Sequence, residues 1–217
     1  MPLITALLPQ PGHKDSVAVY VDGQFVLSLA AALVQQAELH PGLNIPDTLL
    51  LALQDRQMLH DGLQTAYRFL ARGPRSEAEV RKRLQRQEAS DTAIDAVLAK
   101  LKQQRFIDDG AFAAGFAERR ASISPRSGSM VRWELRQRGV AKDVAEDAAA
   151  QLDDDALAYE AGLKRAQRMP AMEYTAFRAK LGGFLQRRGF GYSLTSRVVA
   201  RLWRERQGDE SGESSES

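Results

Sequence analysis

A pair of apolar residues four positions apart recurs three times in this chain, at intervals of 51 and 50 residues. The pairs are Val80 and Leu84, Val131 and Leu135, and Leu181 and Leu185. Such a pair marks the buried face of one helix. A glycine follows the second and third pairs by four positions, at Gly139 and Gly189, whereas the first copy has Glu88 there. This self-similarity predicts an array of related helical units.

Further apolar positions follow each pair in the same order, and they indicate three helices per unit. These positions are Ile94 and Leu98, Val144 and Ala148, and Leu194 and Val198. We place the repeats at residues 63–108, 109–152 and 153–206. Residues 1–62 form a separate N-terminal module, and residues 207–217, which lack apolar side chains, are expected to be a disordered acidic tail. A linear stack of three such units should be elongated.

Local signals define the ends of several helices. Ser76 and Glu79 have the spacing of a capping box, in which each side chain accepts a hydrogen bond from a backbone N–H of the first turn. Ser90 is expected to cap the next helix, and Gly139 and Gly189 are placed where a left-handed residue ends a helix. The scarcity of β-branched residues after residue 61 also favours helices.

The first 30 residues have a different pattern, which predicts a small antiparallel sheet. Val17, Val19 and Val21 alternate along one expected strand, and the turn Asp22-Gly23 that follows is typical of a two-residue hairpin. Short helices should follow at residues 30–39 and from Pro46 onward. The predicted fold class is therefore mainly α: three tandem three-helix repeats with a small N-terminal β module.

Charge is distributed unevenly along the chain, although the formal net charge is only +2. Residues 1–62 contain two basic and six acidic residues, a net charge of −4. Residues 63–207 contain 28 basic and 18 acidic residues, a net charge of +10, and residues 208–217 contain four acidic and no basic residues. A basic body suggests a polyanionic or acidic partner.

Several classes of chemistry lack their motifs. There is no cysteine, which excludes disulfides, cysteine zinc sites and a cysteine nucleophile. No phosphate-binding loop is present, and His13, His40 and His60 lie outside the repeats without a metal-binding spacing. We expect neither a cofactor nor a metal nor an assembled catalytic site, and so a binding protein rather than an enzyme.

Four strings in the repeats resemble the RecX family, whose members regulate the bacterial recombinase RecA. The strings are RGPRSEAEVRKRL at 72–84, FIDDGAFA at 106–113, LRQRGV at 135–140 and FLQRRGF at 184–190. The segment 19–25 also resembles an N-terminal extension that some members carry. Two positions depart from the family pattern: Gly73 replaces an arginine, and Glu88 replaces a glycine.

The resemblance implies a non-enzymatic regulator that binds the groove of the RecA–DNA filament and suppresses its ATPase, recombinase and co-protease activities, in DNA repair and the SOS response. Trp133 is interpreted as a core residue in preference to an interface anchor. Arginine suits either partner, because its planar group binds carboxylate or phosphate through two hydrogen bonds. The candidate contact residues for RecA or DNA are Arg75, Arg81, Lys82, Arg119, Arg120, Arg126, Arg132, Arg136, Arg138, Arg178, Lys180, Arg187 and Arg188.

An alternative is a free-standing DNA-binding protein without sequence specificity, because three-helix units with basic helices resemble helix-turn-helix modules. Contact with single-stranded or double-stranded DNA is compatible with both hypotheses. An enzyme is the third alternative. No stretch is apolar enough to span a bilayer, and the N-terminus, with Pro9 and Pro11, does not resemble a signal peptide. We therefore expect a cytoplasmic monomer without membrane contact.

Overall fold

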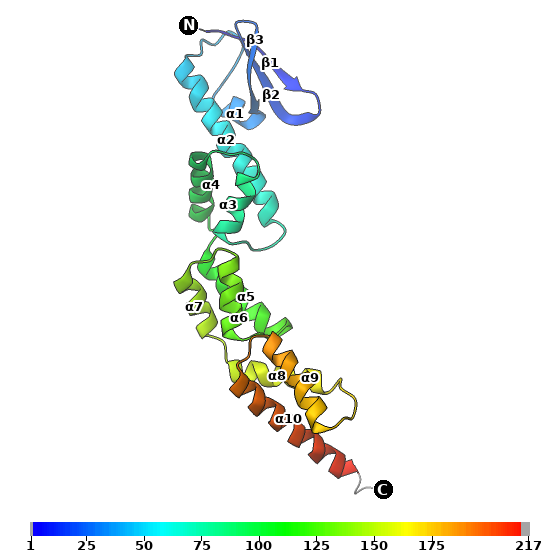
Figure 1. Ribbon diagram of the computed structural model, residues 1–217. Helices are drawn as coiled ribbons and strands as arrows, with labels where there is room; N and C mark the ends of the chain where they lie inside the picture. The colour runs from blue at the N-terminus through cyan, green and yellow to red at the C-terminus, as the bar shows by residue number, and fades with distance from the viewer. Residues whose placement is uncertain (1, 214–217) are drawn as a thin grey trace. The chain divides into compact units, whose positions relative to one another are not determined.

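The computed structural model describes residues 2–213, which are mainly helical with one small sheet at the N-terminus (Figure 1). This confirms the predicted fold class of three-helix repeats preceded by a β module. In chain order the elements are β1 (Ile4–Gln10), β2 (His13–Val21), β3 (Gln24–Ala30), α1 (Ala31–Gln36), α2 (Asp47–Leu70), α3 (Glu77–Gln85), α4 (Asp91–Gln103), α5 (Asp109–Ile123), α6 (Gly128–Gln137), α7 (Lys142–Ala150), α8 (Asp154–Ala166), α9 (Tyr174–Arg187) and α10 (Tyr192–Glu213).

The chain divides into two compact units. The first contains the sheet and α1, α2 and α4, together with α3 from Glu79 onward. The second contains α5 to α10 and, in addition, the segment Ser76–Ala78 at the start of α3. The beginning of α3 therefore makes its tertiary contacts within the second unit.

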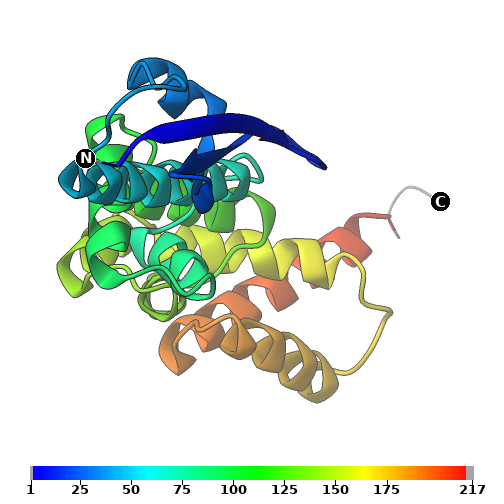
Figure 2. The same cartoon turned by 90° about the horizontal axis from the view of Figure 1, so that it is seen from above.

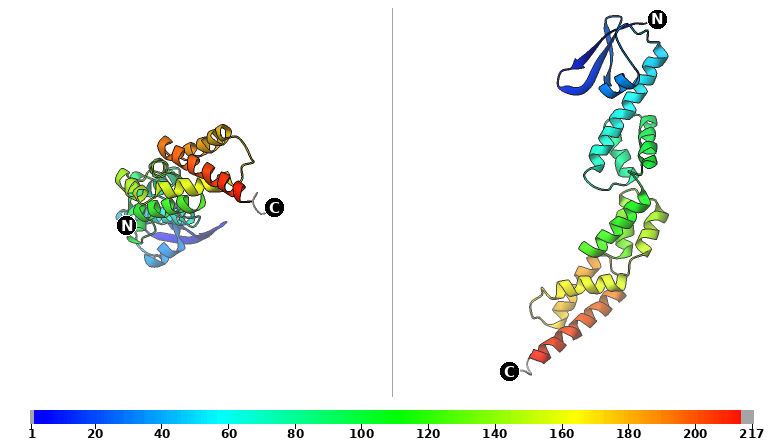
Figure 3. Two further views of the ribbon diagram at one scale, coloured as in Figure 1. Left: turned by 90° about the horizontal axis from the view of Figure 1, so that it is seen from below. Right: turned by 180° about the vertical axis from the view of Figure 1, so that it is seen from behind.

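In the first unit the three strands form an antiparallel meander in the order β1-β2-β3. The hairpin predicted at Asp22-Gly23 is present, and both residues have positive φ angles, of 49° and 81°, as a type I′ turn requires. One face of the sheet is buried around Val19 and Leu29. The long helix α2 extends from this module to α4, as Figure 3 (right) shows.

The predicted domain boundary at residue 62 falls inside α2. The first half of α2 contributes Leu53 to the core of the sheet module, and the second half contributes Ala66 to the core of the first repeat. One continuous helix therefore serves both cores, because its two halves present apolar residues to different neighbours.

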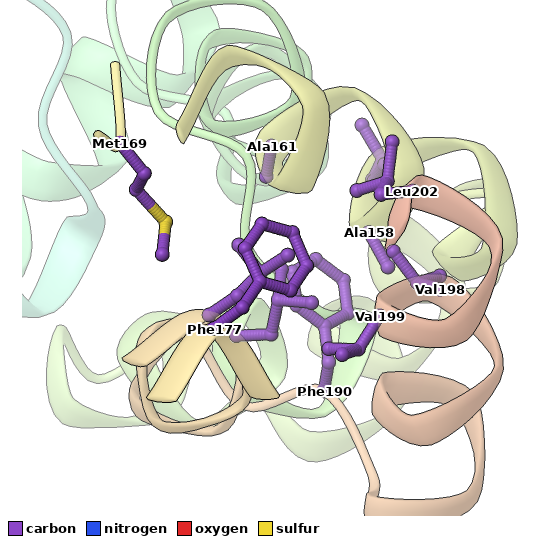
Figure 4. Close-up of a cluster of buried hydrophobic side chains, with 11 residues drawn as sticks. Ala158, Ala161, Met169, Phe177, Phe190, Val198, Val199 and Leu202 are labelled. Carbon is purple, nitrogen blue, oxygen red and sulfur yellow. The ribbon is translucent and has the colours of Figure 1, made fainter. Parts of the chain in front are cut away.

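In the second unit each repeat buries its own apolar cluster. Val131 and Leu135 of the second repeat pack with Phe112 and Phe116 of α5. Helices α8, α9 and α10 of the third repeat pack together (Figure 2) around Phe177, which is fully buried (Figure 4). The apolar pairs read from the sequence are therefore the centres of the repeat cores.

Two hydrogen bonds connect the start of α3 to the second repeat. The hydroxyl of Ser76 donates to the carbonyl oxygen of Arg138 at 2.6 Å. The backbone N–H of Glu77 donates to Asp109 Oδ1 at 2.8 Å. A carboxylate is favourable at this position, because the free N–H groups of a helix start carry partial positive charge.

The same arrangement recurs between the second and third repeats. The N–H of Ser127 donates to the carbonyl oxygen of Arg188 at 3.0 Å, and the N–H of Gly128 donates to Asp154 Oδ1 at 2.7 Å. Ser127 also caps α6 by accepting a hydrogen bond from the N–H of Met130. The second unit thus contains two equivalent joints, in each of which the start of a helix is hydrogen-bonded to the following repeat. Corresponding residues of the two joints, such as Ser76 and Ser127, are about 50 positions apart.

At these joints Gly139 and Gly189 are constrained both by a positive φ angle and by a lack of space for a β-carbon. Gly139 and Gly189 have φ angles of 79° and 89°, as predicted for residues that end a helix. A β-carbon at Gly139 would collide with Ala78, and one at Gly189 would collide with Ser127 and lie 2.8 Å from Met130 Cβ. Close approach of the preceding repeat therefore excludes a side chain.

Glu88, in the turn that follows α3, has the same left-handed backbone, at a φ of 58°, but its side chain is exposed. The first repeat has no preceding repeat to approach this position. The missing glycine is therefore explained by the absence of a close neighbour rather than by a different backbone.

At the C-terminus, α10 continues to Glu213 and so enters the segment for which the sequence predicts disorder. Residues 214–217 lie outside the described part of the chain.

Candidate partner-binding surface

Two of the predicted contact arginines share one carboxylate. Arg120 Nε donates to Glu134 Oε2 at 2.7 Å, and Arg126 pairs with Oε1 of the same side chain. The Glu134 side chain is only 11% exposed. A buried carboxylate needs such partners, so Arg120 and Arg126 hold α5 and the following turn against α6.

Three further predicted arginines lie over aromatic rings. The guanidinium of Arg75 is 4.6 Å from the ring centre of Phe69, and that of Arg138 is 5.0 Å from Phe116. Arg188 lies 4.5 Å from the ring centre of Phe184. A cation placed over an aromatic face is attracted by the ring. These side chains therefore take part in intramolecular packing.

Arg188 is also held by hydrogen bonds, because its Nη1 donates to Ser124 Oγ at 3.1 Å and to the Pro125 carbonyl at 2.9 Å. Burial lowers the pKa of Arg188, and the nearby charge of Arg126 lowers it further. The joint between the second and third repeats therefore brings the positive charges of Arg126 and Arg188 close together.

Other predicted contact residues extend into solvent or make exposed contacts. Arg81 pairs with Asp95 at 2.7 Å. Arg178 donates to the Tyr192 hydroxyl at 3.1 Å, and this hydrogen bond lowers the pKa of Tyr192. The exposed remainder consists of Lys82, Arg119, Arg132, Arg136, Lys180 and Arg187.

Trp133 is 58% exposed, so its assignment to the core was wrong. The buried residues of α6 are Val131 and Leu135, and Trp133 lies two positions from each, on the opposite face of the helix. Arg132 and Arg136 are exposed beside it. We call these three residues, Arg132, Trp133 and Arg136, the α6 patch. Tryptophan and arginine are the residue types that most often dominate protein interfaces.

The equivalent face of α9 is hollow. Gly182 and Gly183 occupy the positions 50 residues after Arg132 and Trp133, and they line a cavity of about 270 Å³ with Tyr174 and other residues of α9 and α10. The second and third repeats therefore present different surfaces on the same helix face.

Three arginines that are absent from the predicted contact residues form a stripe on α10. Arg197, Arg201 and Arg204 line a cavity of about 590 Å³ with Tyr159 and Asp155. Their spacing of four and three residues places them on one face of a helix, and that pattern was visible in the sequence. The first member, Arg197, pairs with Asp155 at 2.6 Å.

The second arginine of this stripe is part of a small network. Arg201 Nε donates to Glu205 Oε1 at 2.8 Å, and the Tyr159 hydroxyl donates to Glu205 Oε2 at 2.9 Å. The hydrogen bond from Arg201 lowers the pKa of Glu205, and the hydrogen bond to Glu205 raises the pKa of Tyr159. Arg201 also lies 4.0 Å from the Tyr159 ring centre, so its orientation is set before any partner binds.

Within residues 2–213 no three side chains of metal-binding type are grouped to hold an ion. None of the helices in that range combines the length and the apolar character needed to cross a membrane.

Sequence models of three RecX domains match this chain. The first three-helix domain matches residues 63–101, the second matches 108–148 and the third matches 153–199, together more than half of the chain. The chain belongs to the RecX family. The α6 patch lies in the second RecX domain, and the α9 hollow and the α10 arginines belong to the repeat that contains the third.

Relatives and solved structures agree with this assignment. The chain is 31% identical over 200 residues to the regulatory protein RecX of Geobacillus kaustophilus, covering 90% of this chain and 74% of that protein. It is 26% identical over 205 residues to the regulatory protein RecX of Bacillus pumilus, covering 92% and 77%. A crystal structure of regulatory protein RecX has a TM-score of 0.66 at 21% identity, covering 91% of this chain and 98% of that one. RecX from Lactobacillus salivarius has a TM-score of 0.59 at 21% identity, covering 67% and 96%. These structures share the fold of the RecX family.

Proposed function

We propose that this chain regulates RecA by binding the filament that RecA forms on DNA, and that it lowers the ATPase, recombinase and co-protease activities of the filament. Membership in the RecX family is the observation that carries the proposal, since the matched domains cover all three repeats. The relatives are named regulatory proteins, which favours a binding role over catalysis.

Within this proposal the α6 patch is the main contact with the filament. Trp133 offers a large rigid apolar surface that is 58% exposed, and Arg132 and Arg136 can each bind a carboxylate through two hydrogen bonds. We leave five arginines out of the proposed direct contacts, because intramolecular contacts hold their guanidinium groups: Arg75, Arg120, Arg126, Arg138 and Arg188.

The test is a titration of this chain into RecA assembled on single-stranded DNA, with ATP hydrolysis as the readout. The unchanged chain should lower the rate at or below one copy per RecA. Trp133→Ala should weaken inhibition at least tenfold, whereas Leu51→Ala, which truncates an apolar side chain that is 62% exposed on α2, should not. An unchanged ATPase rate across the full titration contradicts the proposal.

The charges of the patch are tested in the same assay. Arg132→Glu combined with Arg136→Glu should abolish inhibition, because it replaces two cations with two anions at one surface. Lys100→Glu on α4 is the control, since this lysine is exposed and its ammonium group donates a hydrogen bond to Gln103 of the same helix.

A second candidate function, direct binding of DNA, is favoured by the arginine stripe on α10. Affinity for DNA should then fall steeply with salt, with a slope of about −0.9 per phosphate neutralised on duplex DNA. Arg197→Glu combined with Arg204→Glu separates the two functions. If the affinity for naked DNA collapses while the inhibition of RecA survives, DNA binding is not the mechanism of regulation.

A further inference from the structure

A cavity of about 270 Å³ lies in the second unit between the end of α5, the C-terminal part of α8 and α9. Its apolar part includes Phe184 and Ile123. Ile123 is 80% exposed, the highest value among the large apolar side chains that the structure describes. An apolar surface rimmed by polar groups is typical of an interaction site.

Four cations line the same cavity, and no carboxylate is among its lining residues. The cations are Lys164, Arg165, Arg168 and Arg188. Lys164 pairs with Glu160 at 2.6 Å. The guanidinium of Arg168 is exposed and makes no hydrogen bond or ion pair within residues 2–213, although its backbone N–H donates to the Arg165 carbonyl oxygen at 3.2 Å. The cations surround the apolar floor of the cavity, which Ile123 and Phe184 form, and no acidic side chain among the lining residues balances their charge.

Helix electrostatics account for only half of this cluster. Lys164 and Arg165 lie in the last turn of α8, where cations interact favourably with the helix dipole. Arg168 lies beyond the helix, and Arg188 comes from the end of α9 and is partly desolvated. The helix dipole does not explain why Arg168 and Arg188 line the same cavity as the two cations of α8.

We propose that this cavity binds an acidic peptide segment of a partner protein, with one aliphatic or aromatic side chain packed on Ile123 and Phe184 and flanking carboxylates paired with Arg165 and Arg168. The cavity is smaller than a typical small-molecule site but large enough for one side chain. The carboxylates supply the negative charge that the rim lacks.

Other occupants fit less well. The guanidinium groups of Arg188 and Arg165 lie 4.5 and 5.8 Å from the ring centre of Phe184, where they would obstruct a stacked nucleobase. The acidic residues 209–216 of this chain are accompanied only by serine and glycine, so this segment has no apolar side chain to fill the floor. The inference does not rest on the proposed function, because it concerns a different surface from the α6 patch.

Fluorescence anisotropy with the full chain and synthetic peptides tests the proposal. The probe is a fluorescein-labelled pentapeptide with leucine at its centre and aspartate at the other four positions. Replacing the leucine with alanine should weaken binding at least about fivefold, because apolar area is no longer buried. Replacing the aspartates with asparagine should abolish measurable binding.

Matched variants locate the site. Arg168→Glu should weaken peptide binding about tenfold, while Lys142→Glu, the same change of charge at an exposed position of α7 in the same unit, should change it less than twofold. Ile123→Ala should weaken the leucine peptide but not the alanine peptide. Both Ile123 and Arg168 are exposed, and circular dichroism should show unchanged folding of these variants.

Three results would overturn the proposal. The first is equal affinity for the leucine and alanine peptides. The second is an equal effect of Arg168→Glu and Lys142→Glu, which would indicate unspecific charge attraction. The third is tighter binding of a twelve-nucleotide oligothymidylate that is lost in Arg168→Glu, which would assign the cavity to nucleic acid.

Discussion

The fully buried hydroxyl of Ser76 donates a hydrogen bond of 2.6 Å to the carbonyl oxygen of Arg138, which is 62 residues later in the chain. Arg138 ends α6 and immediately precedes Gly139. The equivalent place at the second joint is taken by Ser127 and Arg188, joined by a backbone hydrogen bond of 3.0 Å. A serine at the start of one helix is therefore bound to the end of the corresponding helix in the next repeat.

Removing the Ser76 hydroxyl should destabilise the second unit. We expect Ser76→Ala to lower the free energy of unfolding by about 1–2 kcal/mol, because the partly buried Arg138 carbonyl oxygen loses a hydrogen-bond donor. Urea denaturation followed by the fluorescence of Trp203, in a Trp133→Phe background, measures this change in the third repeat and its neighbours. Ser122→Ala is the control, since that exposed hydroxyl only contacts the preceding turn of its own helix. Equal effects of the two substitutions would contradict the prediction.

The joint glycines should be intolerant of alanine. Gly189→Ala is expected to cost about 2 kcal/mol or more, because a left-handed backbone disfavours an L-residue by about 1–2 kcal/mol and the added methyl group also collides with Ser127 and Met130. Gly191→Ala, which has open space around the new β-carbon, should cost less than about 1 kcal/mol. The same urea titration compares the two variants.

The corresponding change in the first repeat should have the opposite sign. Glu88→Gly relieves a left-handed glutamate at an exposed position, and it should stabilise the first unit by as much as about 1 kcal/mol. Hydrogen exchange of the α3 and α4 amides measures the change locally. A destabilising effect would show that the Glu88 side chain makes a contribution that outweighs backbone strain.

Trp133 and Trp203 should be distinguishable by fluorescence. Trp203 packs on Tyr174 and Phe177 at ring-centre distances of 5.4 and 5.2 Å, whereas Trp133 is 58% exposed. Trp133→Phe should therefore shift the emission maximum to shorter wavelength and reduce quenching by iodide. A shift to longer wavelength would indicate that Trp133 is buried, which would contradict the prediction.

The Glu205 network should add stability that depends on pH. The hydrogen bond from Arg201 lowers the pKa of Glu205 below its ordinary value of 4.5. The contribution is therefore fully present above pH 4.5 and is lost as the pH falls through the lower folded pKa. The difference in Tm between the unchanged chain and Glu205→Gln should be largest near neutral pH and should vanish in acid. A difference that persists at low pH would assign the effect to packing.

Local patterns in the sequence predicted much of the fold. The apolar pair Val131 and Leu135 is a periodic signal that depends only on helix geometry, and it correctly located a repeat core. The hairpin predicted at Asp22-Gly23 depends on the turn preferences of two adjacent residues, and the structure confirms it with positive φ angles at both. Both features are properties of short stretches of chain, so a single sequence can contain them.

The candidate surface was predicted less well, because exposure depends on distant residues. Arg126 and Arg132 were predicted as contact residues on the same grounds of charge, yet of the two only Arg126 pairs with the shielded carboxylate of Glu134. Trp133 was assigned to the core from the base rates of its residue type, although its position between Val131 and Leu135 places it on the outer face of α6. Here the helical period was a better guide than the residue type.

The sequence by itself determined the repeated helices, the left-handed glycines that end two of them and the uneven charge, since each follows from neighbouring residues or from composition. Only the tertiary structure decided which arginines make intramolecular contacts. It also decided that a side chain would collide with Ala78 at position 139, whereas the side chain of Glu88 is exposed. The meeting of cations from α8, α9 and the turn after α8 at one cavity likewise depends on the tertiary structure. The physical reason is that a free guanidinium, a collision or a cavity is a relation between atoms far apart in the chain, and folding alone brings them together.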